Sequence, residues 1–118
     1  MKLIIDYKLD NWNDTINKSR TNYAYANEIK QKEMKIIELF IKEQKLKPIE
    51  KYPIKLNCIW HVKYFRSDLD NKSLKTVLDQ LQKSNILKND NLKHINEINH
   101  KVLKDTHDYL ELEIIESE

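Results

Sequence analysis

The chain has 118 residues and a mass of 14.3 kDa, which corresponds to a single domain. Hydrophobic residues make up 40% and charged residues 34%, so we expect a folded domain with a modest core. No apolar run approaches the length of a membrane span, and neither secretion nor membrane insertion is expected. Because the single Cys58 cannot form an internal disulfide, the expected compartment is the reducing cytoplasm.

Charge is distributed unevenly along the chain. Residues 105–118 hold six of the 19 acidic residues and no Lys or Arg. Residues 1–104 therefore carry 21 basic and 13 acidic residues, a net charge of +8. Such an excess attracts polyanions, including nucleic acids. A lysine-rich solvated surface produces the same excess, so charge alone does not decide the function.

The first half of the chain predicts a strand, a loop and a long helix. Residues 2–9 alternate between apolar and polar side chains, which is typical of a strand. Residues 10–22 are rich in Asn, Asp, Ser and Thr and lack periodicity, which favours a loop. From residue 23 to residue 46, good helix formers carry apolar residues at helical spacing, and Pro48 marks the end of this helix.

The second half predicts a strand, a helix and two further strands. Residues 54–64 alternate most clearly and indicate a half-buried central strand. A helical stripe of apolar residues spans 70–84, and this helix leaves through Ser84 and Asn85. Two more strands are expected within 92–103 and 109–116. Because the chain contains no glycine, its turns must rely on Asn, Asp or Ser.

These elements predict an α+β fold in which residues 1–118 form one small domain. Its order is β-α-β-α-β-β, with a mixed sheet and two helices. Cys58 alternates with Leu56 and Trp60, so we expect a core residue and not a nucleophile. The four histidines lack the spacing of a zinc site and are expected at the surface or in ordinary hydrogen bonds.

Three aspartates flank the second predicted helix. Asp68 and Asp70 precede it and Asp90 follows it, so we expect the three carboxylates to converge at one end of the sheet if the preceding strand stays extended. Carboxylate oxygens are preferred ligands of Mg²⁺. Each aspartate also has a structural interpretation, with Asp70 as a helix N-cap, Asp68 in a turn and Asp90 as the side-chain acceptor of a turn. Both interpretations remain open from these residues alone.

A wider pattern surrounds the three aspartates. It consists of Asp68-Leu69-Asp70-Asn71, Lys75, Leu78-Asp79-Gln80-Leu81 and Asn89-Asp90. This pattern resembles the RusA family of Holliday junction resolvases, phage and prophage endonucleases with an Asp-x-Asp-Asn motif, a nearby Lys, a Leu-Asp-Ala-Leu-like helix and an Asp pair before the third strand. Residues 15–17, 20–22 and 23–30 also resemble the polar loop and helix start of Gram-positive phage members.

The resemblance implies roles for particular residues. Asp68, Asp70 and Asp90 match the metal-binding catalytic aspartates, which would hold Mg²⁺ or Mn²⁺, and Lys75 matches the catalytic-site lysine. One extra residue precedes the lysine, which turns Lys75 by about 100° around the helix from the usual face unless that residue is absorbed before the first turn. Asn89 replaces the first Asp of the family's pair. A surface ion pair with Asp79, four residues on, is the alternative role for Lys75.

The resemblance also implies an activity and partners. The expected protein is a Mg²⁺-dependent, structure-selective endodeoxyribonuclease that resolves four-way junctions by paired nicking in phage or prophage DNA recombination and repair. Because such a junction is two-fold symmetric, a homodimer is expected. Candidate phosphate contacts on the loop and the first helical turns are Lys18, Arg20, Lys30, Lys32 and Lys35. The alternative is a catalytically inactive RusA-like scaffold of a mobile element that binds nucleic acid or protein.

Overall fold

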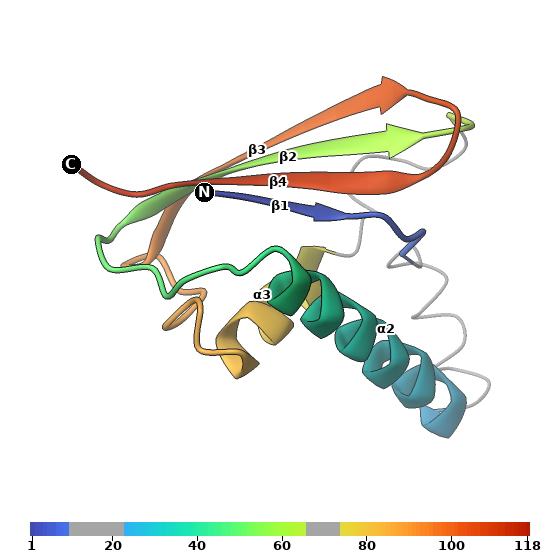
Figure 1. The fold of residues 1–118 in the computed structure, drawn as a ribbon, viewed down its shortest axis with the longest axis horizontal. Coiled ribbons are helices and arrows are strands. Elements are labelled where there is room, and N and C mark those ends of the chain that lie inside the picture. The colour runs from blue at the N-terminus through green and yellow to red at the C-terminus, as the bar shows by residue number, and fades with distance from the viewer. Residues whose placement is uncertain (10–22, 66–73) are drawn as a thin grey trace.

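The residues described in the computed structural model are 1–9, 23–65 and 74–118. They form β1 (Lys2–Ile5), α2 (Tyr23–Glu43), β2 (Ile54–Val62), α3 (Leu74–Lys83), β3 (Ile95–Lys104) and β4 (Tyr109–Ile115). The molecule has two layers, a four-stranded sheet and two helices that both lie on one side of it (Figure 1). This arrangement confirms the predicted α+β class, the element order and the mixed sheet.

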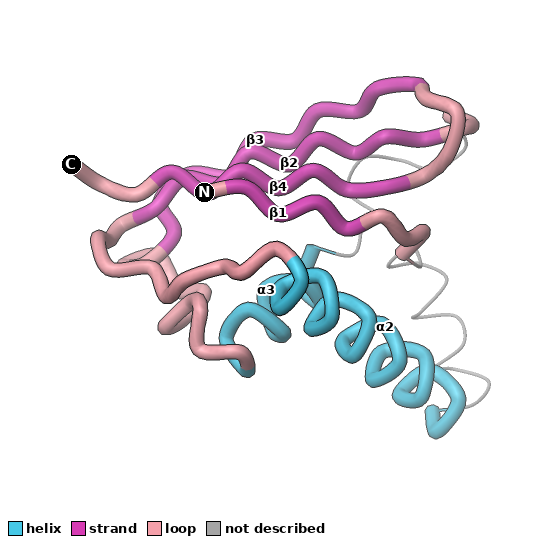
Figure 2. Tube along the Cα trace, viewed as in Figure 1, coloured by secondary structure: helices cyan, strands magenta, loops and turns pink. Residues whose placement is uncertain are grey.

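The strands lie in the order β1-β4-β2-β3 (Figure 2). β4 is antiparallel to both of its neighbours, β1 and β2. β2 and β3 are parallel, with Ile54 opposite Ile95 and Val62 opposite Lys104. A parallel pair needs a crossover connection, and α3 lies between these two strands in the chain. β2 is therefore a central strand, as its alternation predicts.

The core lies between the sheet and the helices. Alternate residues of β2 and β4 point into it, and so do the apolar stripes of the two helices. Members that are at most 4% exposed include Leu56, Cys58, Leu110, Leu112, Ile114, Ile37, Ile41, Val77 and Leu81. Burial raises the pKa of the Cys58 thiol to about 12, which confirms a core role for this cysteine. Among the described residues, no helix is long and apolar enough to cross a membrane.

Two strands end earlier than predicted. β1 ends at Ile5, whereas Tyr7 and Leu9 continue to pack on the core beyond the strand. β2 ends at Val62, and the next backbone N–H, that of Lys63, donates to the Asp108 side chain at 2.6 Å. In both cases apolar alternation continues past the last ladder hydrogen bond, so the sequence pattern overestimates the strand length.

Both helices end in the same hydrogen-bonded motif. The residue after each helix cap is left-handed, with φ of 55° at Lys45 and 60° at Asn85. Beyond them, Leu46 N–H donates to the Ile41 carbonyl at 3.2 Å and Ile86 N–H to the Leu81 carbonyl at 2.9 Å. Asn85 fits the prediction for a glycine-free chain, whereas a lysine was not expected at such a position. The same turn ends α2 at Glu43, before the predicted residue 46.

We expect Lys45→Gly to stabilise the protein by about 0.5–1 kcal/mol. Glycine adopts positive φ without the steric cost that a Cβ atom imposes, although part of the gain is offset by the greater freedom of the unfolded chain. Urea unfolding measures the change. Lys47→Gly is the matched control, because Lys47 is exposed and lies outside the left-handed region. An equal or larger gain in the Lys47 variant would contradict this assignment.

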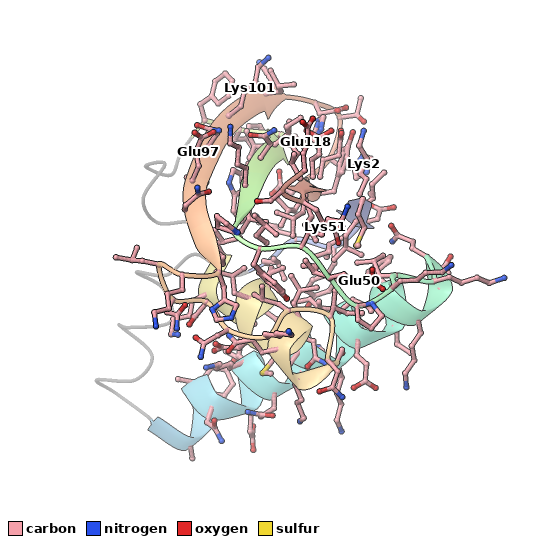
Figure 3. The ribbon with its side chains drawn as sticks, turned by 90° about the vertical axis from the view of Figure 1, so that its left-hand side faces the viewer. Lys2, Glu50, Lys51, Glu97, Lys101 and Glu118 are labelled. Carbon is pink, nitrogen blue, oxygen red and sulfur yellow. The ribbon has the colours of Figure 1, made fainter. Side chains whose placement is uncertain are left out.

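The two edges of the sheet differ. On β1, the Ile4 N–H donates to Gln44 Oε1 at 2.8 Å, and Gln44 Nε2 donates to the Ile4 carbonyl at 2.6 Å. The amide of Gln44 thus occupies the place of a neighbouring peptide group. β3 pairs only with β2 among the described residues. Figure 3 shows Glu97 and Lys101 along this strand, on the side of the molecule away from the helices.

The sheet face opposite the helices is polar. Asn57 on β2 donates to Glu113 on β4 at 2.9 Å and accepts from Asn99 on β3 at 3.0 Å. These side chains form a hydrogen-bonded row across three strands. The polarity of this face explains why both helices pack against the other one.

Candidate functional site

Of the three predicted metal-binding aspartates, Asp90 is described, whereas Asp68 and Asp70 lie outside the described residues. Asp90 is in the connection between α3 and β3. Because β3 begins opposite Ile54, the first residue of β2, this connection enters the sheet where β2 begins. Residues 66–73 follow the other end of β2. Asp90 itself lies beside the first turn of α3, where its Oδ2 is 3.7 Å from Lys75 Nζ.

Lys75 and Asp90 are close together. Lys75 is in the first turn of α3, and its Nζ lies 3.7 Å from Asp90 Oδ2. The same Nζ lies 3.5 Å from Asp79 Oδ1, one helical turn further on. The extra residue before Lys75 thus does not prevent its ammonium from reaching Asp90. The predicted Lys75–Asp79 ion pair is also present.

A second lysine joins this group from the other helix. Lys30 of α2 places its Nζ 2.9 Å from Asp79 Oδ2. Lys30, Asp79, Lys75 and Asp90 together form what we call the charged cluster. Their side chains are between 23% and 61% exposed, so a ligand in solution can reach them. The cluster combines two positive and two negative side chains from α2, α3 and the connection to β3.

The turn around Asp90 is built by asparagines. Asn89 Oδ1 accepts from the Asn91 N–H at 3.2 Å, and Asn91 Oδ1 accepts from the Lys93 N–H at 3.1 Å. Such side-chain acceptors are the usual structural role of Asp and Asn in turns. Within the part of the chain that the structure describes, the Asp90 carboxylate is instead paired with Lys75. The side-chain acceptor role that the sequence offered for Asp90 is therefore taken by its neighbours, Asn89 and Asn91.

The predicted phosphate contacts do not share one surface of α2. At about 100° per residue, Lys32 and Lys35 lie roughly 200° and 140° around the helix from Lys30. Lys32 and Lys35 are exposed, whereas Lys30 is half-buried against α3 by way of Asp79. Lys18 and Arg20 lie outside the described residues. Lys30 thus belongs to the charged cluster, and Lys32 with Lys35 forms a separate solvent-facing pair.

The residue types fit a hard divalent cation. Asp90 offers carboxylate oxygens and is about one-third exposed, which leaves room for water ligands. Within residues 1–9, 23–65 and 74–118, no group of three His, Cys, Asp or Glu side chains could hold a metal ion. A complete site would therefore need ligands beyond these ranges, and Asp68 and Asp70 are the candidates that the sequence pattern names.

A second group of titratable side chains surrounds His61, which is 8% exposed. Its Nδ1 lies 2.9 Å from Asp105 Oδ2 and its Nε2 lies 2.9 Å from Glu111 Oε1. The ring stacks on Tyr109 with centroids 3.9 Å apart. Each ring nitrogen of His61 therefore lies within hydrogen-bonding distance of a carboxylate oxygen. This arrangement fits the prediction of an ordinarily hydrogen-bonded histidine, but its two carboxylate partners were not anticipated.

Both carboxylates around His61 are favoured in their charged form. The backbone N–H of Thr106 holds the pKa of Asp105 below its usual range, with further hydrogen bonds from His61 and Tyr109. The hydrogen bond from His61 is the main cause that lowers the pKa of Glu111. Burial, followed by the nearby Asp105 charge, raises the pKa of the Tyr109 phenol. The group therefore ties the end of β2 to the β3–β4 turn and to β4 itself.

The charged cluster is an open surface site. A cavity of about 370 Å³ lies elsewhere, between the C-terminal ends of the two helices. Its lining residues are Glu38, Ile41, Lys42, Lys45, Leu46, Lys83, Ser84 and Ile86, none of which belongs to the cluster. An open site suits a large polymeric substrate better than an enclosed small molecule.

Comparison with known proteins adds no relative. No protein-family model matches the chain, and no curated protein matches it at a significant level.

Proposed function

We propose that this protein is a RusA-like, Mg²⁺-dependent endodeoxyribonuclease that cleaves branched DNA at four-way junctions. The observation that carries the proposal is the approach of Lys75 to Asp90, with Nζ and Oδ2 3.7 Å apart. These residues are 15 positions apart and match separate parts of the RusA pattern. Their proximity in the fold is what a shared site requires.

The proposed site combines a metal ion with cationic side chains. Asp68, Asp70 and Asp90 would hold Mg²⁺ or Mn²⁺, which when bound acidifies a water and neutralises charge on the reacting phosphate. Lys75 contributes a fixed positive charge beside Asp90, where it would attract a phosphodiester and stabilise its developing negative charge. Lys30 adds a second positive charge from α2. The function of this site would be hydrolysis of one DNA strand.

Paired nicking of a junction requires two such sites. We propose a homodimer, because one site per subunit on a two-fold axis matches the symmetry of the substrate. The biological role would be recombination and repair of phage or prophage DNA in the cytoplasm. The buried, unpaired Cys58 is compatible with that reducing compartment.

A direct test compares a labelled four-way junction with a linear duplex of the same sequence during titration with Mg²⁺. We expect metal-dependent nicks in opposed strands of the junction and little cleavage of the duplex. Mn²⁺ should replace Mg²⁺, whereas Ca²⁺ should support binding with little cleavage. Tight junction binding without cleavage at any Mg²⁺ or Mn²⁺ concentration would favour the alternative, an inactive RusA-like binding scaffold.

Phosphate binding by the solvent-facing pair is tested by salt dependence. If Lys32 and Lys35 contact phosphates, the double variant Lys32→Gln/Lys35→Gln should flatten the log–log dependence of affinity on salt by up to about two units. Fluorescence anisotropy of a labelled junction in EDTA measures binding without cleavage. The control replaces Lys47 and Lys51, two exposed lysines outside both helices, with Gln. Equal slopes for the two double variants would place the DNA contacts elsewhere.

A further inference from the structure

The carboxylate of Asp79 is shared by two lysines from different helices. Its Oδ2 lies 2.9 Å from Lys30 Nζ on α2, and its Oδ1 lies 3.5 Å from Lys75 Nζ on α3. The Asp79 side chain is 23% exposed, less than either lysine at 39% and 61%. Asp79 is therefore less exposed than the two lysines that pair with it, and both lysine side chains approach it from the solvent side.

Lys75 has the most exposed side chain of the charged cluster. A lysine has a long flexible stem, and at 61% exposure little packing restricts its rotamers. Two carboxylates attract its ammonium and so restrict its position, that of Asp79 at 3.5 Å and that of Asp90 at 3.7 Å. If Asp90 binds another cation, its attraction for Lys75 is weakened by that ion's charge. Asp79 then remains as the anchor that keeps the ammonium near Asp90.

We propose that Asp79 is a positioning residue that holds the Lys75 ammonium beside Asp90 and, through Lys30, fixes α2 at the same place. This inference rests on the proposed function, because it assigns Asp79 a role in that site. Asp79 itself would touch neither the metal ion nor the scissile phosphate. Its effect would be on the rate of cleavage and not on the affinity for DNA.

Asp79→Asn tests this role, because it removes the charge and keeps the size. With junction and Mg²⁺ saturating, we expect the single-turnover cleavage rate to fall by about 10- to 100-fold, as for other residues that orient a metal site's groups. The dissociation constant for the junction should change by less than about threefold. Asp79→Glu should recover part of the rate. Thermal unfolding should shift by less than about 5 °C, since the side chain lies on the helix surface.

A second readout needs neither DNA nor metal. In the wild type, a held Lys75 should show two distinct ε-methylene proton signals in NMR spectra, assigned by their loss in Lys75→Arg. In Asp79→Asn these signals should merge, because the ammonium then samples many positions. Asp79→Glu should separate them again.

Glu38→Gln is the matched control. Glu38 forms a similar ion pair with Lys42, four residues on, at 3.1 Å, and accepts a hydrogen bond from Gln80 on α3 at 3.4 Å, so it also joins the two helices without belonging to the charged cluster. Equal effects of Asp79→Asn and Glu38→Gln on both readouts would overturn the proposal, and so would a loss confined to DNA affinity. If the wild type cleaves no junction, the proposed nuclease function fails. The Lys75 signals then decide separately whether Asp79 holds this lysine.

Discussion

Asp90→Asn should reduce the rate of junction cleavage by at least about 100-fold and leave junction binding within about threefold of the wild type. The substitution removes a ligand charge from the proposed metal site and preserves the size of the side chain. Single-turnover cleavage and anisotropy measure the two quantities on the same labelled junction. Asp6→Asn is the control, because Asp6 is an exposed aspartate whose partner is His107.

Asp68→Asn and Asp70→Asn should lose cleavage to a similar extent, since the three aspartates are proposed to bind one ion. Retained cleavage in any two of the three variants would contradict a shared site. A loss of thermal stability without loss of cleavage would instead support the capping and turn roles that each aspartate could have.

His61→Phe should lower the free energy of unfolding by about 1–3 kcal/mol at neutral pH. Phenylalanine keeps the stack on Tyr109, but Asp105 and Glu111 lose the hydrogen-bonding ring that lies between them, and two like charges remain. Urea unfolding measures the difference. His107→Phe is the control, because His107 also pairs with an aspartate but its side chain is 56% exposed. Equal losses in the two variants would show that burial of the His61 group is unimportant.

The difference in the free energy of unfolding between the wild type and His61→Phe should depend on pH. The folded pKa values of Asp105 and Glu111 are lowered, so their contribution to stability is present above the unfolded values of about 4. It is lost as the pH falls through the folded values. The hydrogen bond from His61 is the main cause that lowers the pKa of Glu111. The unfolding free energies of the wild type and His61→Phe should therefore become more similar below about pH 4. A constant difference from pH 7 to pH 3 would contradict this linkage.

Local patterns in the sequence predict much of this fold. Alternation identifies β2 and β4, because each has one face on the core and one face toward solvent. Asn85 is recognisable as a helix-ending residue, since it tolerates positive φ. Lys75 and Asp90 could be named only through the RusA-like pattern, and their proximity required the fold.

Other features depend on contacts that no local pattern encodes. The partners of His61 are 44 and 50 residues away, and by alternation this histidine belongs to the solvent side of β2. It is buried because Tyr109 covers it and two carboxylates satisfy its nitrogens. The separation of Lys30 from Lys32 and Lys35 follows helix geometry, but the pairing of Lys30 with Asp79 depends on how α2 packs against α3.

The amide of Gln44 has a consequence for aggregation. An exposed strand edge is a template for another chain, and Gln44 already occupies the outward-facing N–H and carbonyl of Ile4 in the middle of β1. Gln44→Ala would free both groups on a four-residue strand that carries the exposed Ile4 side chain. The longer edge at β3 carries Glu97, Lys101 and Lys104, whose charges disfavour stacking of identical strands. Gln44 at the β1 edge and the charged residues at the β3 edge would thus disfavour edge-to-edge association of the sheet with other copies of the chain.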